Sequence, residues 1–456
     1  MNAGRIIRII ASLLMLAGCG ATSFTGLTPS ASAQRRGPRS NPSQATSEQT
    51  ISQLREAASL LESGRAAEAE PILRRVLIAN PNNSDAHNLL GIVLDQAGKT
   101  AAAEREYREA LRLNPKFVSP LANLGVLFTR TQRIPQAIDA FLAVLRIAPN
   151  HPQATMNLGV LYTARGEYEP AVELLKRARE IQPDSFDILY NLGISLYNLK
   201  RYDDATTALQ SASSLSPGTA EPLYFLGLIA YARNLDETAH ELWDRAIALN
   251  QNYAAANFML GELSVKRNDY ATAKTYYQKA LSQDAATAVY HIRLGGAYLY
   301  LHDFNRAFEI FKNASERFPR IAEIHYFLSV TARTKGDSNL ALTALKKALA
   351  INPTYADALA LFGAILLDKG DLVEAEKLFR KAIQANSNNY NANYDLGRLL
   401  TKQQRYSDAL APLQQASRIL PANAEVHYQL FLTYSRLNRK DDANQELEIF
   451  KSLNKK

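Results

Sequence analysis

The chain repeats itself every 34 residues over most of its length, and this period constrains its fold more than any other feature. Nine glycines occupy one slot of the repeat, and Ser329 fills the empty slot between Gly295 and Gly363. The glycines are Gly91, Gly125, Gly159, Gly193, Gly227, Gly261, Gly295, Gly363 and Gly397. A fixed period in this range indicates one supersecondary unit stacked many times, so we expect a linear array rather than a globule.

Other columns of the repeat keep the same register. Alanine stands twelve residues after each glycine slot, as in Ala103, and a large apolar residue such as Tyr107 follows four residues later. Proline closes most repeats, as at Pro115. Small and large residues thus alternate one helical turn apart, which predicts helices that approach closely at the small residues while the large side chain fills the neighbouring hole.

Each repeat has the pattern of two amphipathic helices. Apolar residues recur three and four apart on both sides of a break at Gly98 and Lys99. In the other repeats the break column often holds glycine or asparagine, which favours a left-handed residue at the end of the first helix. Less favourable residues hold it at Gln132, Lys200, His302 and Gln404. The sequence therefore predicts an all-α fold of helical hairpins.

These columns resemble the tetratricopeptide repeat. With Thr50 as the first position, the resemblance covers residues 50–456 as twelve repeats. It implies a right-handed α-solenoid, that is, a superhelix of about twelve 34-residue helix-turn-helix repeats, with a concave groove that binds other proteins or peptides. Gln251, Ala285 and Ser387 replace the closing proline at three junctions.

The N-terminus has the features of an export signal. Residues 1–18 combine a basic start with an apolar run that is too short to cross a membrane. Residues 16–19 read Leu-Ala-Gly-Cys, which resembles a bacterial lipobox and implies cleavage before Cys19 and lipidation of its thiol. Gly20 follows, so the resemblance implies a lipoprotein on the periplasmic face of the outer membrane. The alternative is cleavage after Ala33, which would give a soluble periplasmic or secreted protein.

Residues 19–49 are rich in serine, threonine, proline and glycine, which predicts a disordered tether. Five arginines and Glu48 in the first 49 residues account for half of the net charge of +8. The repeats show no basic stripe along one face. Nucleic acid is therefore not an expected partner.

The sequence contains no converging set of catalytic or metal-ligating residues. Four of the seven histidines, His87, His291, His325 and His427, occupy one repeat position, the one that holds tryptophan in the family. We interpret them as packing or surface residues. Neither an HExxH motif nor a glycine-rich phosphate loop is present. We expect no enzyme activity, no cofactor, no metal and no small-molecule substrate.

Asparagine precedes the glycine slot by two residues in three successive repeats, at Asn123, Asn157 and Asn191. Equivalent positions in stacked hairpins line up, so the sequence predicts a ladder of amides. The ladder resembles that in the repeats of the glycosyltransferase that adds N-acetylglucosamine to proteins, where asparagines on the concave face hold an extended peptide. The alternative is that each asparagine bonds to its own helix or a nearby turn.

One position earlier, a column of mostly aromatic residues is a second candidate for the groove. Its members are Tyr190, Tyr224, Phe258, Ile292, Tyr326, Tyr394 and Tyr428. Tyrosine offers contact area at low entropic cost together with a polar group, and it is enriched at interfaces. The alternative is ordinary packing between repeats.

Together these features predict a non-catalytic scaffold of the bacterial cell envelope that binds proteins or extended peptides in its groove. The alternative function is that of a substrate-recognition or regulatory subunit of a separately encoded envelope enzyme, such as a glycosyltransferase or a protease. An enzyme in its own right is the third class, and the lack of a catalytic constellation argues against it.

Overall fold

A computed structural model describes residues 42–454, and every regular element in that range is an α-helix. The predicted signal peptide, Cys19, Ala33 and the predicted tether up to residue 41 lie outside the described residues. The helices α2 to α13 are Pro42–Glu62, Ala66–Ala79, Ser84–Gln96, Thr100–Leu113, Val118–Arg130, Ile134–Ile147, Pro152–Arg165, Tyr168–Ile181, Phe186–Asn198, Tyr202–Leu215, Ala220–Ala232 and Asp236–Leu249. The helices α14 to α25 are Ala254–Lys266, Tyr270–Gln283, Ala288–Tyr300, Phe304–Arg317, Ala322–Thr334, Ser338–Ile351, Ala356–Lys369, Leu372–Ala385, Tyr390–Lys402, Tyr406–Ile419, Ala424–Arg436 and Lys440–Leu453.

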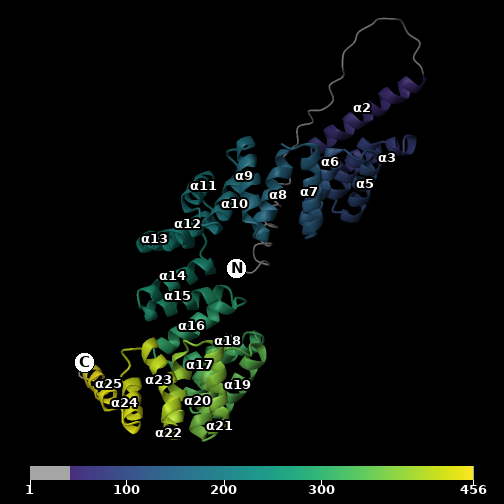
Figure 1. Ribbon diagram of the computed structural model, residues 1–456. Helices are drawn as coiled ribbons and strands as arrows, with labels where there is room; N and C mark the ends of the chain where they lie inside the picture. The colour runs from purple at the N-terminus through teal and green to yellow at the C-terminus, as the bar shows by residue number, and fades with distance from the viewer. Residues whose placement is uncertain (1–41, 455–456) are drawn as a thin grey trace. The chain divides into compact units, whose positions relative to one another are not determined.

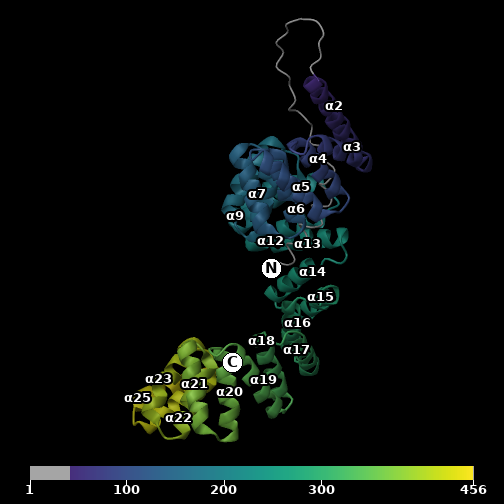
Figure 2. The same ribbon diagram turned by 90° about the vertical axis from the view of Figure 1, so that its right-hand side faces the viewer.

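The helices pair in sequence order into hairpins, so the predicted all-α fold of helix-turn-helix repeats is confirmed. Each first helix packs on the second helix of its own hairpin, and within each of two units each hairpin packs on its neighbours along the chain. The contacts gather in two compact units, an N-terminal unit that ends at Leu249 and a C-terminal unit that begins at Asn250. Within each unit, Figure 1 and Figure 2 show successive helix pairs stacked side by side. The boundary lies beside Gln251, one of the positions where the closing proline is missing.

Every hairpin of the described chain breaks at one left-handed residue, as the sequence predicts. The φ angle is +72° at Gly98, where the Lys99 amide then donates to the Leu94 carbonyl at 2.9 Å. This bond spans six residues and satisfies a carbonyl that the helix end would leave free. Gln132, Lys200 and Gln404 adopt the same conformation, with φ between +60° and +62°. These side chains pay the steric cost that glycine avoids.

The glycine slot faces the large residue of the second helix in the same hairpin. A Cβ atom on Gly91 would lie 2.5 Å from the Tyr107 ring, and one on Gly227 would lie 2.4 Å from the Trp243 indole nitrogen. Tyr107 and Trp243 are completely or almost completely buried. The predicted close approach of the two helices is therefore confirmed, and it explains why glycine fills most of these slots.

The first helix, α2, begins at Pro42, eight residues before the first repeat position at Thr50. Proline suits the first helical position because its missing amide hydrogen would be unpaired there in any case. From Ser43 to Glu62 neither glycine nor proline interrupts the helix. Among the helices described, none combines the length and apolar character needed to cross a membrane.

Candidate protein-binding surface

The first helices of the hairpins lie together on one side of each unit. In the N-terminal unit α4 contacts α6, α6 contacts α8, α8 contacts α10 and α10 contacts α12, whereas second helices make no comparable contacts with one another. In the C-terminal unit the same holds for the series α18, α20, α22 and α24. The first helices thus line the more closely spaced side of each stack, which we call the inner face.

The three predicted asparagines lie on adjacent first helices, but their hydrogen bonds differ. Asn123 on α6 donates from Nδ2 to Oδ1 of Asn88 on α4 at 3.2 Å. Asn191 on α10 donates to the carbonyl of Asp187, one turn back in its own helix, at 2.8 Å. Asn157 on α8 is 6% exposed and makes no hydrogen bond to any described residue. The three amides therefore share a face without forming a uniform ladder.

A row of aliphatic residues runs beside these amides, and the sequence analysis did not single it out. Each member follows the glycine slot directly and lies three residues, or one helical turn, after the asparagine position. All but the last remain partly exposed; the row is Ile92, Val126, Val160, Ile194 and Leu228. Its signal in the sequence is the repeated pair of glycine and a branched aliphatic residue. We call Asn88, Asn123, Asn157, Asn191 and this row the amide–aliphatic face.

The aromatic column of the N-terminal unit is mostly used for packing between repeats. Tyr190 is 3% exposed, and its ring stacks on Phe186 at 5.5 Å and meets the edge of Phe225 at 6.0 Å. Burial, with smaller effects of Glu221 and Tyr224, raises the pKa of Tyr190. Tyr224 is also buried. These two rings leave little surface for a ligand.

In the C-terminal unit the same column is more open. Ile292 is buried, whereas Phe258, Tyr326 and Tyr394 are partly exposed and Tyr428 is 40% exposed. The Phe258 ring still lies 5.0 Å from that of Tyr290. Within this column, the accessible tyrosine surface is therefore found on α18, α22 and α24.

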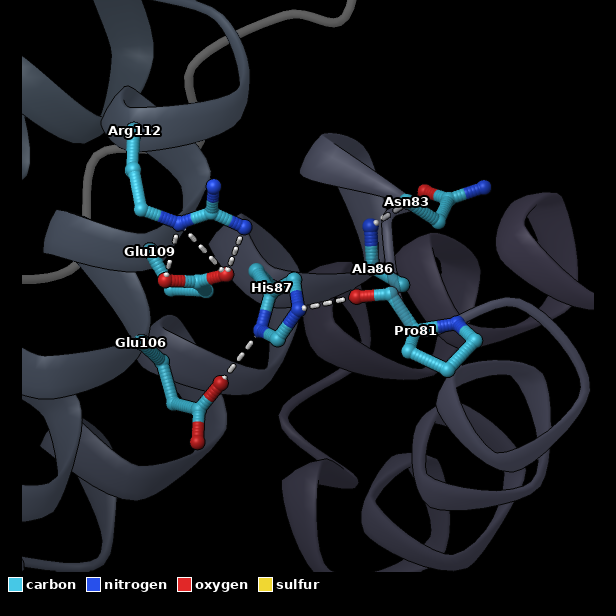
Figure 3. A network of polar contacts seen from close by, with 7 residues as sticks. All are labelled: Pro81, Asn83, Ala86, His87, Glu106, Glu109 and Arg112. Atoms are coloured by element: carbon cyan, nitrogen blue, oxygen red, sulfur yellow. Dashed lines mark hydrogen bonds and ion pairs between the residues drawn. The ribbon is translucent and has the colours of Figure 1, made fainter.

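The histidine column holds the closing turns of the repeats. Figure 3 shows His87 between the Pro81 carbonyl, 2.9 Å from Nε2, and the Glu106 carboxylate, 2.6 Å from Nδ1. His291, His325 and His427 place Nε2 in the same way against the carbonyl six residues earlier, at 3.0 to 3.2 Å. The Nε2 contacts join each histidine to the closing turn of the preceding repeat, which gives the column a structural role.

No group of three histidine, cysteine, aspartate or glutamate residues suited to a metal ion occurs within residues 42–454. Of the histidines outside this column, His151 caps α8 by accepting the Ala154 amide at 3.3 Å, and burial lowers its pKa. His240 lies 3.2 Å from Asp244 on the same helix. These histidines have local structural partners.

Sequence comparison with known families gives matches along most of the repeats. Models described as tetratricopeptide repeat or TPR repeat match residues 54–117, 159–200, 190–239, 254–287, 292–356, 344–377 and 366–414. The chain is a tetratricopeptide-repeat protein. Proteins built from this repeat are generally non-catalytic scaffolds that bind other proteins or peptides, which supports a protein-binding role for this chain.

Solved structures similar to this tetratricopeptide-repeat protein share little sequence with it. Yeast Tom70 has 14% identity and a TM-score of 0.39, with 87% of this chain and 97% of that chain covered. The APC/C hetero-tetramer Cut9–Hcn1 has 16% identity and a TM-score of 0.46, with coverages of 87% and 92%. YrrB, described as a TPR protein with an unusual peptide-binding site, has 22% identity and a TM-score of 0.35, with coverages of 41% and 97%. No curated protein matches the chain.

Proposed function

We propose that this tetratricopeptide-repeat protein is a non-catalytic scaffold of the bacterial cell envelope that binds an extended segment of a partner protein along the amide–aliphatic face. The observation that carries the proposal is the chemistry of α6 and α8. The only charged residues of these helices are their last ones, Arg130 and Arg165. Their inner face therefore offers aliphatic and amide groups without charge.

Such a face suits the backbone of an extended peptide. An amide can donate to a peptide carbonyl and accept from a peptide N–H, so it binds main chain without selecting side chains. The partly exposed Val126 and Val160 provide apolar contact beside it. The Asn157 side chain is nearly buried and has no hydrogen-bond partner among the described residues, and it is not one of the buried unpaired groups, so its amide is available to a peptide group that reaches it.

A photo-crosslinking residue at Val160 tests this binding in cells. We expect it to capture a partner, whereas the same residue at Glu173, exposed on the second helix α9 of the same hairpin, captures none or different proteins. Replacing Asn123, Asn157 and Asn191 together with alanine should weaken the Val160 adduct while helical circular dichroism is retained. Equal adducts at both positions, or an adduct unaffected by the triple substitution, would refute the proposed face. An envelope enzyme as the captured partner would favour the subunit role.

Attachment to the outer membrane through Cys19 is the second part of the proposal. The support is the Leu-Ala-Gly-Cys sequence at residues 16–19 behind an apolar run. Acyl chains buried in the bilayer supply the anchor, and stable attachment takes more than one. Cys19→Ser should release the protein from the membrane fraction. If labelled palmitate does not enter the unchanged protein, the lipid anchor is wrong and the cleavage site after Ala33 is the one to map.

A further inference from the structure

The inner face of the C-terminal unit carries a second surface of different chemistry, where the first helices begin. An acidic residue is the second residue of three of these helices: Glu323 on α18, Asp357 on α20 and Glu425 on α24. Tyrosines surround them at Tyr326, Tyr355, Tyr390, Tyr394 and Tyr428. We call these eight residues the tyrosine–carboxylate edge.

The tyrosines of the edge form pairs that remain partly open to solvent. The rings of Tyr326 on α18 and Tyr355, which immediately precedes α20, lie 5.2 Å apart, so this pair joins two hairpins. Tyr390 and Tyr394 on α22 stack nearly parallel at 5.7 Å. Tyr428 on α24 is 40% exposed. Tyrosine rings are therefore exposed at the junction of α18 with α20, on α22 and on α24.

The carboxylates lie close to these hydroxyl groups. Tyr394 donates from its hydroxyl to Glu425 at 3.4 Å. Burial and, next, the charge of Asp357 raise the pKa of Tyr326 to about 12, and burial raises the pKa of Tyr390 to about 12 with help from Tyr394 and Glu425. The hydroxyls therefore stay neutral at physiological pH. The negative charge of the edge belongs to the three carboxylates.

These carboxylates lack the cations that their neighbours have. None of the three forms an ion pair with a described residue, and Asp357 accepts only the Asn389 side-chain amide, at 2.7 Å. Further along the same helices, Asp368 pairs with Arg333 at 2.9 Å and Asp395 with Arg398 at 3.6 Å. The acids without a cation are thus those at the tyrosine-rich end.

Most basic residues of these first helices are too far away to neutralise the three carboxylates, whereas Arg398 lies 5.9 Å from the centroid of the Tyr394 ring and pairs with Asp395. Arg333, Lys402 and Arg436 stand in the last turns of their helices, about ten residues after the carboxylate position. At 1.5 Å of rise per residue this separation is about 15 Å. Charges exposed to water are largely screened beyond about 8 Å in physiological salt. The carboxylates of Glu323, Asp357 and Glu425 therefore present negative charge without an ion-pair partner next to aromatic rings.

One further polar group points to a missing partner. The Tyr390 hydroxyl oxygen is buried and has no hydrogen-bond partner among the described residues. Leaving a buried hydroxyl without a hydrogen-bond acceptor costs free energy, and a ligand group that accepts the hydrogen bond removes this cost. A peptide carbonyl beside the stacked pair of Tyr390 and Tyr394 would do so.

We infer that the tyrosine–carboxylate edge docks a basic, extended segment of a partner protein, whose lysine or arginine side chains lie over the tyrosine rings and pair with the carboxylates on α18, α20 and α24. A cation over an aromatic face and beside a carboxylate is attracted by both. First helices of adjacent repeats lie about 10 Å apart, and an extended chain advances about 3.4 Å per residue. Cations about three residues apart therefore match Glu323 and Asp357, and cations about six residues apart match Asp357 and Glu425, which the repeat of α22 separates. This surface is independent of the amide–aliphatic face and adds a second partner chemistry.

The test uses the full-length protein and two fluorescent peptides. One carries arginine at every third position in a glycine–serine background, and the other carries the same arginines consecutively. Binding is measured by anisotropy at two salt concentrations. The edge variant combines three substitutions: Glu323→Gln, Asp357→Asn and Glu425→Gln. We expect this variant to bind the spaced peptide about tenfold more weakly, because three modest contacts with cations are lost together.

The matched control neutralises three acids in the first turns of second helices of the same unit: Glu374→Gln, Asp408→Asn and Asp442→Asn. It removes the same charge and should change binding less than about twofold, because exposed charges off the site contribute little. Equal weakening by both triple variants would show non-specific attraction and overturn the docking site, as would undiminished binding by the first. Equal affinity for the consecutive peptide would overturn the repeat spacing.

A variant of the other face keeps the two proposals apart. The alanine substitutions at Asn123, Asn157 and Asn191 should leave binding of the spaced peptide unchanged. A loss there equal to that of the edge variant would overturn the assignment of the basic segment to the C-terminal unit. Circular dichroism on every variant verifies that the helices persist.

Discussion

Gly295 and Phe311 meet so closely that a Cβ on Gly295 would lie 2.4 Å from the Phe311 ring, whereas a Cβ on the adjacent Gly296 would have no atom within 4 Å. Both glycines lie inside α16. Glycine in a helix interior is unfavourable in itself, so Gly295 is retained by packing, and the folded structure offers no such reason for Gly296.

The two glycines therefore predict opposite outcomes. Gly295→Ala should destabilise the C-terminal unit by about 1 to 3 kcal/mol through overpacking against Phe311. Gly296→Ala should stabilise it by about 0.5 to 1 kcal/mol, because alanine favours the helix and finds free space. Urea denaturation of the two variants and the unchanged protein compares the midpoints. A shift in the same direction for both would contradict the packing account.

The bond between His427 and Glu446 should contribute to stability. Glu446 Oε2 lies 2.6 Å from His427 Nδ1, and the histidine side chain is 6% exposed. Glu446→Ala leaves this ring nitrogen without its partner and should cost about 1 to 3 kcal/mol of unfolding free energy. Glu448→Gln, which removes an exposed charge of the same helix that pairs with Lys451, should cost less than about 1 kcal/mol. Thermal unfolding of the two variants compares these losses, and an equal loss in both would contradict a specific role of the bond between His427 and Glu446.

A second histidine of the same column lacks the carboxylate that His427 has. His325 occupies the same repeat position as His427, but its Nδ1 is buried and has no partner among the described residues. Ala344 stands where Glu446 stands in the last repeat. Ala344 is only 2% exposed and packs in a hydrophobic cluster, whereas Glu446 is partly exposed. Ala344→Glu should therefore lower the free energy of unfolding, because overpacking costs about 1 to 3 kcal/mol and one hydrogen bond returns about 1 kcal/mol. A gain in stability would show that the site accommodates the carboxylate beside His325.

The contact between Glu104 and Arg133 should make stability depend on pH. Arg133 holds both oxygens of Glu104 across two hairpins, at 2.7 and 3.0 Å, and these hydrogen bonds lower the pKa of Glu104 below its ordinary value of 4.5. A lowered folded-state pKa stabilises the fold above pH 4.5, and the stabilisation is lost as the pH falls through the folded-state value.

Glu104→Gln should thus destabilise the protein at pH 7 by about 2 kcal/mol, typical of hydrogen bonds to charged groups, and much less at pH 3. Glu109→Gln is the control, because Glu109 pairs with Arg112 on the same helix in an exposed position. Its effect should stay below about 1 kcal/mol. Denaturation at both pH values measures the difference, and a Glu104→Gln effect that does not shrink at pH 3 would contradict the ion pair as its source.

Replacing Gln132 should stabilise the turn between α6 and α7. Its φ is +60°, and its column holds Gly98 at +72° in the preceding repeat. Because a side chain costs about 1 to 2 kcal/mol in this conformation, Gln132→Gly should raise stability by up to about 1 kcal/mol after the entropic cost of glycine. Gly98→Gln should lower it by a similar amount. The melting temperature should rise for Gln132→Gly and fall for Gly98→Gln. Shifts in the same direction would contradict the steric cost of a side chain at this position.

The periodic columns predicted the helices and their breaks because each column reflects one packing or backbone requirement that recurs in every hairpin. The left-handed residue at Lys200 and the buried ring at Phe311 follow from position in the repeat alone. The start of α2 at Pro42 did not, since residues 42–49 carry no apolar periodicity and belong to no repeat column.

The candidate surfaces were less predictable for a different reason. Asn123 pairs with Asn88, which belongs to the neighbouring column, and the burial of Tyr190 depends on Phe225 of the next repeat. Such contacts depend on which residues differ between adjacent repeats, whereas the columns report what the repeats share. The aliphatic row from Ile92 to Leu228 is itself periodic and could have been found in the sequence.

Within each unit a hairpin contacts mainly its neighbours, so the length of the array can change by whole 34-residue repeats. Removing residues 118–151 would join Phe117 to Pro152 with the closing turn and the start of the next first helix both kept in register. Removing a few residues more or fewer would misplace every later glycine slot against its ring. Whole-repeat gain and loss is therefore the route by which such a chain can change its reach toward a partner while each surviving hairpin keeps its own contacts.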